Sequence, residues 1–99
     1  MPKLYRVRIT PRALWDLQRI FDYIAQDSPA YADLVIRRLA AAVERLRVFP
    51  ESGRVVPEHN TPRVREIIVR PYRIVYRRHS DRIEIVTVFH AARLFPDIS

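Results

Sequence analysis

Residues 10–50 read TPRALWDLQRIFDYIAQDSPAYADLVIRRLAAAVERLRVFP, and this stretch decides the fold. Thr10-Pro11 and Ser28-Pro29 are each typical of a helix start, with a hydroxyl residue at the N-cap and proline at the first helical position. Phe49-Pro50 ends the second helix, because the residue before a proline disfavours the helical conformation. Since the connection between the helices is very short, we expect an antiparallel helical hairpin over residues 11–48.

Each predicted helix carries one apolar stripe at spacings of three and four residues. The stripe of the first helix consists of Leu14, Leu17, Phe21 and Ile24. The stripe of the second helix consists of Ala32, Ile36, Leu39, Val43 and Leu46. Trp15 and Tyr23 fall outside the first stripe, so we expect both side chains to be partly exposed on the hairpin.

Alternating patterns predict strands on both sides of this hairpin. Residues 4–9 are predicted to form a strand, because Tyr5-Arg6-Val7-Arg8-Ile9 alternates apolar and basic side chains, which is typical of a half-buried strand. Residues 50–63 hold three prolines and the only glycine, so we expect a loop there. Residues 64–90 contain three β-like runs with tight connections, which predicts an antiparallel meander, and a C-terminal tail follows over residues 91–99.

The last β-like run is apolar on both of its alternating faces. Ile83, Ile85 and Phe89 fall on one face, and Val86 and Val88 fall on the other. Such a strand is covered on both sides, and the helical hairpin can cover only one of them. The other face is therefore covered either by more of this chain or by a partner.

The order β-α-α-β-β-β predicts a single α+β domain over residues 1–99, with the helical hairpin packed on a mainly antiparallel sheet. The 48% apolar share suits a folded domain, and no apolar run reaches the roughly 18 residues of a membrane span. The absence of cysteine excludes disulfides, cysteine-based zinc sites and thiol nucleophiles. The first residues lack the apolar stretch of a signal peptide, so we expect a cytoplasmic protein without membrane contact.

The charge is strongly positive and almost entirely arginine. The chain has 18 basic against 11 acidic residues, a net charge of +7, and Lys3 is its only lysine. Residues 63–93 hold eight arginines against three acids, so this segment carries an excess of five positive charges. Guanidinium groups match phosphate and carboxylate groups, so we expect an acidic partner, either nucleic acid or protein.

Several ordered segments of the chain together resemble the RelE/ParE toxins of bacterial type II toxin–antitoxin systems. The segments that carry this resemblance are Asp22-Tyr23-Ile24-Ala25, Ser28-Pro29, Phe49-Pro50-Glu51-Ser52-Gly53-Arg54, Val64-Arg65-Glu66, Tyr72-Arg73-Ile74-Val75-Tyr76 and Val88-Phe89-His90-Ala91-Ala92-Arg93. They span about residues 5 to 95, and the predicted order of elements agrees with the fold of that family. The extended pattern favours the ParE-like branch.

The resemblance implies one of two activities, because RelE-like members cleave mRNA on the ribosome and ParE-like members poison DNA gyrase. The ParE-like activity implies a toxin that arrests growth and stabilises plasmids, with Arg65, Arg73, Arg77, His90 and Arg93 contacting the target. It implies no bond-breaking residue, no metal and no cofactor.

The RelE-like alternative implies a metal-independent endoribonuclease that uses Arg65, Arg73, His90 and Arg93. Arg73 matches the arginine of those enzymes, but their lysine pair is here Arg65 and Ile67, and their C-terminal tyrosine has no match. Arginine is a poor general base, so His90 would have to serve. Whether Arg65 and Arg73 share a sheet face depends on the turn at Pro71, which the pattern leaves open.

The resemblance also implies a cognate acidic antitoxin. The toxin would contact operator DNA only through this antitoxin. We expect this antitoxin to contact Trp15, Tyr23, Val86 and Val88. A third hypothesis is an inactive accessory of an antitoxin–DNA complex.

Overall fold

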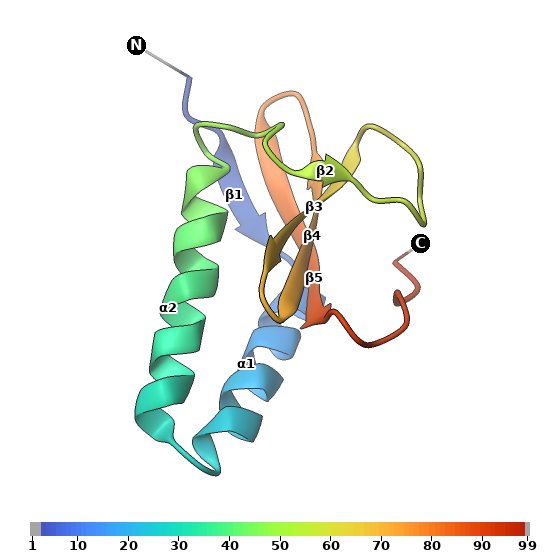
Figure 1. Cartoon of the computed structure of the whole chain (residues 1–99). Coiled ribbons are helices and arrows are strands. Elements are labelled where there is room, and N and C mark those ends of the chain that lie inside the picture. Colours follow the sequence, from blue (N-terminus) through green and yellow to red (C-terminus); the bar gives the residue numbers. More distant parts are fainter. Residues whose placement is uncertain (1–2, 99) are drawn as a thin grey trace.

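The computed structural model describes residues 3–98 as two helices packed on one face of a five-stranded sheet (Figure 1). The elements in chain order are β1 (Arg6–Ile9), α1 (Pro11–Ala25), α2 (Pro29–Arg45), β2 (Arg54–Val55), β3 (Val64–Val69), β4 (Tyr72–Arg78) and β5 (Arg82–His90). The predicted α+β class and the packing of the hairpin on a mainly antiparallel sheet are confirmed. Residues 1, 2 and 99, which the predicted domain includes, lie outside the described residues.

The helical hairpin forms where its capping signals place it. The Thr10 hydroxyl accepts a hydrogen bond from the Ala13 amide at 3.1 Å, and the Ser28 hydroxyl accepts one from the Tyr31 amide at 3.1 Å. Each bond satisfies a donor that the first turn of a helix leaves free. The second helix ends at Arg45, three residues before the predicted boundary, because residues 46–48 continue as tighter turns.

The sheet has the strand order β1-β5-β4-β3-β2. Only β1 pairs in parallel, with β5, and the other neighbours are antiparallel. The two-residue strand β2 lies inside the segment predicted as a loop over residues 50–63. Two residues are too few to show an alternating pattern, so this strand left no signal in the sequence.

Strand β5 contains a bulge that changes which residues share a face. Val75 pairs with Thr87 and Tyr76 pairs with Ile85, so Val86 has no partner in β4. A bulge of one residue shifts the alternation of everything that follows it. Ile83, Ile85 and Val88 therefore pack in the core under the helices, and Val86 and Phe89 pack in a second core. The predicted grouping of Phe89 with Ile83, and of Val88 with Val86, is wrong for this reason.

The chain itself covers the second face of the sheet. The second core contains Val56 from the loop before β3, together with Val64, Val75, Val86 and Phe89 of the sheet. Phe95 and Ile98 of the C-terminal tail pack against it. Figure 1 shows this tail curling back beside the sheet on the side away from the helices. Of the two coverings that the sequence allowed, the structure uses more of this chain.

The start of α1 completes the edge of β5 where β1 has ended. Asp16 accepts hydrogen bonds from the Thr87 hydroxyl at 2.6 Å and from the Val88 amide at 3.1 Å. The Thr10 amide and hydroxyl both donate to the Ile85 carbonyl, at 3.1 and 2.8 Å. These bonds replace the strand partner that this part of β5 lacks, and they fix α1 against the sheet.

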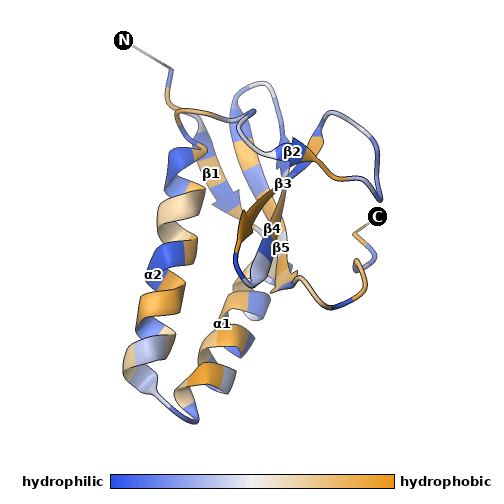
Figure 2. Cartoon of the chain, viewed as in Figure 1, coloured by the Kyte–Doolittle hydropathy of each residue, from blue (hydrophilic) through white to orange (hydrophobic). Residues whose placement is uncertain are grey.

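The buried face of α1 is narrower than its apolar stripe. Its buried residues are Ala13 and Asp16, with Leu17, Ile20 and Ile24 packed against the core as partly buried residues. Leu14, predicted to lie in the core, is 62% exposed. In Figure 2 both helices carry hydrophobic and hydrophilic residues side by side along their length. Within residues 3–98, neither helix has the length and apolar character that crossing a membrane requires.

Replacing Asp16 by Ala tests the role of this side chain at the edge of β5. The change leaves the buried Thr87 hydroxyl and Val88 amide without their acceptor, at about 1–3 kcal/mol for each unsatisfied group. We expect the free energy of unfolding, measured by urea denaturation, to fall by at least about 2 kcal/mol. Asp22→Ala is the matched control, because exposed Asp22 bonds only to Gln18, and we expect a change within about 0.5 kcal/mol. Equal effects of the two substitutions would contradict this role.

Candidate functional site

Arg73 is the centre of a charged cluster on the sheet face opposite the helices. Its Nε donates to Glu66 Oε1 at 2.5 Å, and its two terminal nitrogens donate to the Glu58 carboxylate at 3.1 and 3.0 Å. Arg54 Nε donates to the other oxygen of Glu66 at 2.6 Å. The strand register places Arg54 opposite Glu66 and Arg73 opposite Ile68, so the three charged residues share one face. Two arginines and two carboxylates form this cluster, and their formal charges cancel.

The cluster lies under the C-terminal tail. The Glu66 side chain is fully buried, and Arg73 is buried as well. The Arg73 guanidinium lies 5.1 Å from the ring centre of Phe89 and 5.2 Å from that of Phe95, and these two rings meet edge to face. A cation over aromatic rings gains electrostatic attraction, and the rings also exclude water from it. The guanidinium of Arg73 is thus enclosed by two carboxylates and two rings.

Arg73 and Glu58 shift each other's pKa. The hydrogen bond from Arg73 holds the pKa of Glu58 below its usual range, against a smaller opposing effect of desolvation. The bonds to Glu58 and then Glu66 raise the pKa of Arg73 above its already high value. Both groups are therefore charged at neutral pH, and Arg73 cannot act as an acid or a base.

Arg73 is one of the residues predicted to contact the target, and the structure places it inside the charged cluster. Its donors are bonded to Glu58 and Glu66, and its side chain is buried. A phosphate or an acidic protein surface would have to displace two carboxylates and the tail to reach it. The signal that could have revealed this is Glu66, an acid at an inward position of a strand, which requires a buried cation beside it.

Arg65 lies on the opposite face of the sheet from Arg73, so the arginines predicted as a possible patch do not converge. Arg65 pairs with Tyr76, and its guanidinium donates to the carbonyl groups of Pro62 at 2.9 Å and Gly53 at 2.9 Å. Arg77 shares the face of Arg73 by alternation, and it donates to the Ile98 carbonyl in the tail at 2.9 Å. Both arginines hold backbone segments in place.

His90 and Arg93 are exposed at the end of the sheet where β5 stops. The His90 ring meets the ring of Tyr72 edge to face at 5.9 Å, and its Nδ1 accepts a hydrogen bond from the Ala92 amide at 3.0 Å. The Ala91 amide donates to the Pro71 carbonyl at 2.8 Å, which joins this segment to the β3–β4 turn and so to Arg70. Burial raises the pKa of the Tyr72 hydroxyl, so this phenol is neutral at physiological pH.

The four residues of the predicted endonuclease site do not form one centre. His90 pairs with Tyr72 and Arg65 pairs with Tyr76, so these two lie four residues apart along β4, or about 13 Å. Arg73 lies on the other face from both. The carboxylates beside Arg73 are those of Glu58 and Glu66, and both accept hydrogen bonds from its guanidinium. Residues 3–98 also contain no group of three or more side chains that could hold a metal ion.

The residues predicted to contact an antitoxin divide into two classes. Trp15 is 54% exposed and Tyr23 is 74% exposed, and the Arg19 guanidinium lies 4.8 Å from the Trp15 ring centre. Val86 and Val88 are only 7% and 3% exposed, because each of them packs in one of the two cores. The structure therefore places both valine side chains in the cores of this chain and not on its surface.

Comparison with known proteins identifies relatives along nearly the whole chain. The family model described as the ParE toxin of the type II toxin-antitoxin system, parDE, matches residues 7–95. A Sinorhizobium fredii protein named "Putative toxin Y4kP" is 40% identical over 95 residues, with 94% of this chain and 95% of that protein covered. Toxin RelE2 of Caulobacter vibrioides is 43% identical over 86 residues, covering 86% of this chain and 93% of that protein.

A solved structure shares the fold. A chain from the chromosomal ParDE TA system of P. aeruginosa superposes with a TM-score of 0.73 at 22% sequence identity. The superposition covers 89% of this chain and 97% of that chain. The hairpin on a five-stranded sheet is therefore an architecture that a more distant sequence also adopts.

The lowered pKa of Glu58 predicts an acid-dependent contribution to stability. A carboxyl whose folded pKa lies below its unfolded value stabilises the protein above the unfolded value, near 4.5, and loses that effect as pH falls through the folded value. Glu58→Gln removes the ionisation, so we expect the variant to be less stable than the unmodified chain at pH 6 and the difference to shrink towards pH 3. Urea denaturation across this range measures the difference. A gap that stays constant with pH would contradict the Glu58–Arg73 ion pair.

Proposed function

The chain belongs to the ParE toxin family of type II toxin–antitoxin systems, and we propose that it arrests growth by binding DNA gyrase and not by cutting RNA. It is neutralised by a cognate acidic antitoxin in the cytoplasm. The toxin contacts operator DNA only through that antitoxin. The same activity accounts for plasmid stabilisation, because cells that lose the antitoxin are arrested.

The observation that carries this proposal is the enclosure of Arg73. An endonuclease needs cations with free donors at the scissile phosphate, and it needs a base for the attacking hydroxyl. The donors of Arg73 are bonded to Glu58 and Glu66, and Phe89 and Phe95 cover its guanidinium. The arginine that a cleavage mechanism would use is thus occupied within the fold.

The target surface that we propose is the end of the sheet that carries His90 and Arg93. Both residues are exposed, and Arg70 of the neighbouring turn is exposed as well. Neither Arg70 nor Arg93 forms an ion pair within residues 3–98, so both charges are available to an acidic or DNA-bearing partner. Arg77 and Arg65 are not part of this surface, because Arg77 donates to the Ile98 carbonyl and Arg65 donates to the Pro62 carbonyl.

The antitoxin surface that we propose is the outer side of the helical hairpin. Trp15 and Tyr23 both lie on α1, and large exposed aromatic side chains are preferred anchors of protein interfaces. The chain carries a net charge of +7, which favours fast, salt-sensitive association with an acidic partner.

Two other functions stay open to test. One relative bears the name Toxin RelE2, which keeps a ribosome-dependent mRNA endonuclease as the alternative. An inactive accessory of an antitoxin–DNA complex is the other. The first requires cleaved transcripts, and the second requires normal growth when the chain is expressed alone.

Removing the side chains of His90 and Arg93 tests the gyrase proposal. We expect the purified chain to inhibit gyrase supercoiling, and His90→Ala/Arg93→Ala to weaken inhibition by roughly tenfold or more through lost polar and charged contacts. Arg38→Ala/Arg45→Ala is the control, because it removes positive charge from exposed residues of α2. Unaffected supercoiling together with cleaved mRNA in a translating extract would establish the endonuclease instead. Unaffected supercoiling without growth arrest would establish the accessory.

Changing the aromatic pair on α1 tests the antitoxin surface separately. We expect Trp15→Ala/Tyr23→Ala to weaken antitoxin binding in calorimetry by about tenfold or more, since each truncation removes an exposed anchor. Supercoiling inhibition should persist, because the proposed target contacts His90 and Arg93 are unchanged in this variant. The control is Leu34→Ala on α2, a similarly exposed apolar residue. Antitoxin affinity that is unchanged in the double variant would reject this surface.

A further inference from the structure

A small hollow lies at the end of the sheet opposite His90 and Arg93. It is lined by Pro62, Arg63 and Arg65 at the start of β3, by Arg78, His79 and Ser80 at the end of β4, and by Glu51. Its volume is about 230 Å³. Pockets that enclose drug-sized ligands measure about 300–1,000 Å³, so this hollow accepts a single chemical group.

The walls of the hollow are strongly cationic. Its lining includes three arginines and one carboxylate, that of Glu51. Arg63 is exposed and forms no ion pair within the described residues. Lys3 adds a further positive charge beside the hollow, because its Nζ donates to the Ser80 carbonyl at 3.1 Å. The positive charge around the hollow therefore exceeds the negative charge of its own lining.

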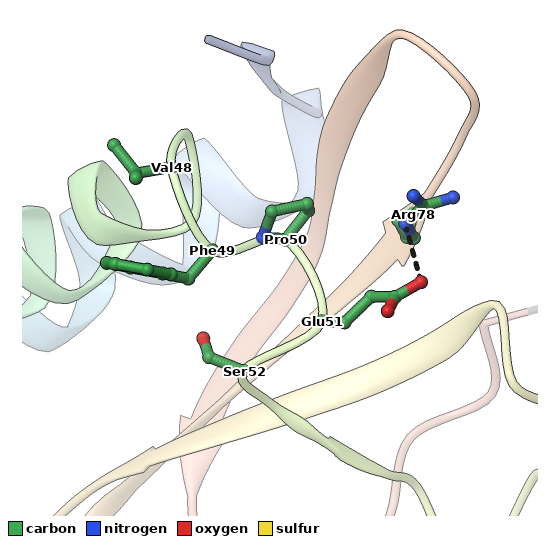
Figure 3. A pocket seen from close by; sticks show the side chains of 6 residues that line it. All are labelled: Val48, Phe49, Pro50, Glu51, Ser52 and Arg78. Carbon is green, nitrogen blue, oxygen red and sulfur yellow. Dashed lines mark ion pairs between the residues drawn. The ribbon is translucent and has the colours of Figure 1, made fainter. Parts of the chain in front are cut away.

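Two buried nitrogen atoms at the hollow form no hydrogen bond. In the described part of the chain, Arg78 Nε and His79 Nε2 are shielded from solvent and lack a hydrogen-bond partner, although Glu84 Oε1 lies 3.6 Å from His79 Nε2. Glu51 forms an ion pair with Arg78 Nε at 3.3 Å, drawn as a dashed line in Figure 3, but this contact is not a hydrogen bond. An unsatisfied buried donor is costly, so an acceptor supplied by a ligand would be favoured here.

The arginine donors that already have hydrogen-bond partners hold the walls of the hollow in place. Arg65 donates to the Pro62 and Gly53 carbonyls, and Arg78 donates to the Tyr5 hydroxyl at 3.1 Å. These bonds hold two guanidinium groups in place before any ligand arrives, and preorganised donors bind with less loss of entropy. Glu51, in contrast, has a side chain that is 63% exposed, and a solvent-exposed ion pair contributes little. A stronger anion can displace it.

We propose that this hollow binds a phosphate group of a nucleic-acid backbone. A phosphate offers more acceptor oxygens than a carboxylate, and it matches the planar fork of arginine. The Glu51 carboxylate already lines the hollow beside Arg78 and leaves Arg78 Nε without a hydrogen bond, so a second carboxylate offers no advantage. Pro62 is the single apolar residue of the lining, whereas a peptide would need apolar anchors.

This inference is independent of the gyrase proposal. The hollow lies at the far end of β4 from the turn at Pro71, and it includes neither His90 nor Arg93. Arg73 is not part of the hollow either. Failure of the hollow to bind would leave supercoiling inhibition unaffected, and failure to inhibit gyrase would leave binding to the hollow unaffected.

The test measures binding of a labelled 12-mer DNA and of inorganic pyrophosphate to the full chain. We expect Arg63→Gln to weaken DNA binding about tenfold at low salt, and to lower the slope of log K against log salt by about one. Arg78→Gln should have at least the same effect, with thermal melting used to confirm that this variant folds. Glu51→Gln removes the competing carboxylate and should tighten binding several-fold, an opposite change that a damaged fold would not produce.

Arg38→Gln and Arg45→Gln are the matched controls, since each removes one charge from an exposed arginine of α2. Losses in these controls equal to the loss in Arg63→Gln would overturn the proposal by showing a general charge effect. Tighter binding of an octaglutamate peptide than of DNA at the same residues would make the hollow a carboxylate site and overturn it. Pyrophosphate binding no weaker than DNA binding would identify a free phosphate as the ligand and overturn the nucleic-acid assignment. No binding of either probe at low salt would overturn it entirely.

Discussion

Strand β5 has to be buried on both of its faces, and the rest of the architecture meets that constraint. Ile83, Ile85 and Val88 need the helical hairpin above them, and Val86 and Phe89 need a second cover below. The bulge at Val86 divides the strand between the two cores. The helices pack on one side for this reason, and the tail with Phe95 and Ile98 returns across the other side.

The second cover determines what the charged residues beneath it can do. By bringing Phe95 over Arg73, the tail removes this cation from water, and a buried cation is tolerated only with carboxylate partners. Glu66 provides one from β3, and Glu58 provides the other from the loop before it. Glu66 is itself fully buried, so it needs Arg54 as well. A residue that would be a phosphate ligand on an open sheet has thereby become part of the second core.

Local signals in the sequence were enough to predict the hairpin and the three long strands. Thr10 and Ser28 cap the helices through contacts within one turn, and alternation marks the long strands. The bulge at Val86 could not be predicted, because it depends on how β5 pairs with β4. The site was predicted less well for the same reason. Arg73 acquires Glu58 from fifteen positions away along the chain, and no local pattern encodes that contact. Leu14 has the right spacing for the core, but α1 lies along the edge of the sheet and leaves it exposed.

The same architecture separates arginines that are bonded within the fold from arginines that partners can reach. Arg73 and Arg54 are neutralised in the second core, and Arg65 and Arg77 are bonded to backbone carbonyl groups. Within residues 63–93, the arginine charge that partners can reach lies near the two ends of β4, with Arg70 and Arg93 at one end and Arg63 and Arg78 at the other. Seven residues of extended strand separate these ends by about 20 Å, which exceeds the Debye length of about 8 Å at physiological salt. The two ends therefore attract anions independently, and a single arginine-rich strand pair can present two separate binding surfaces.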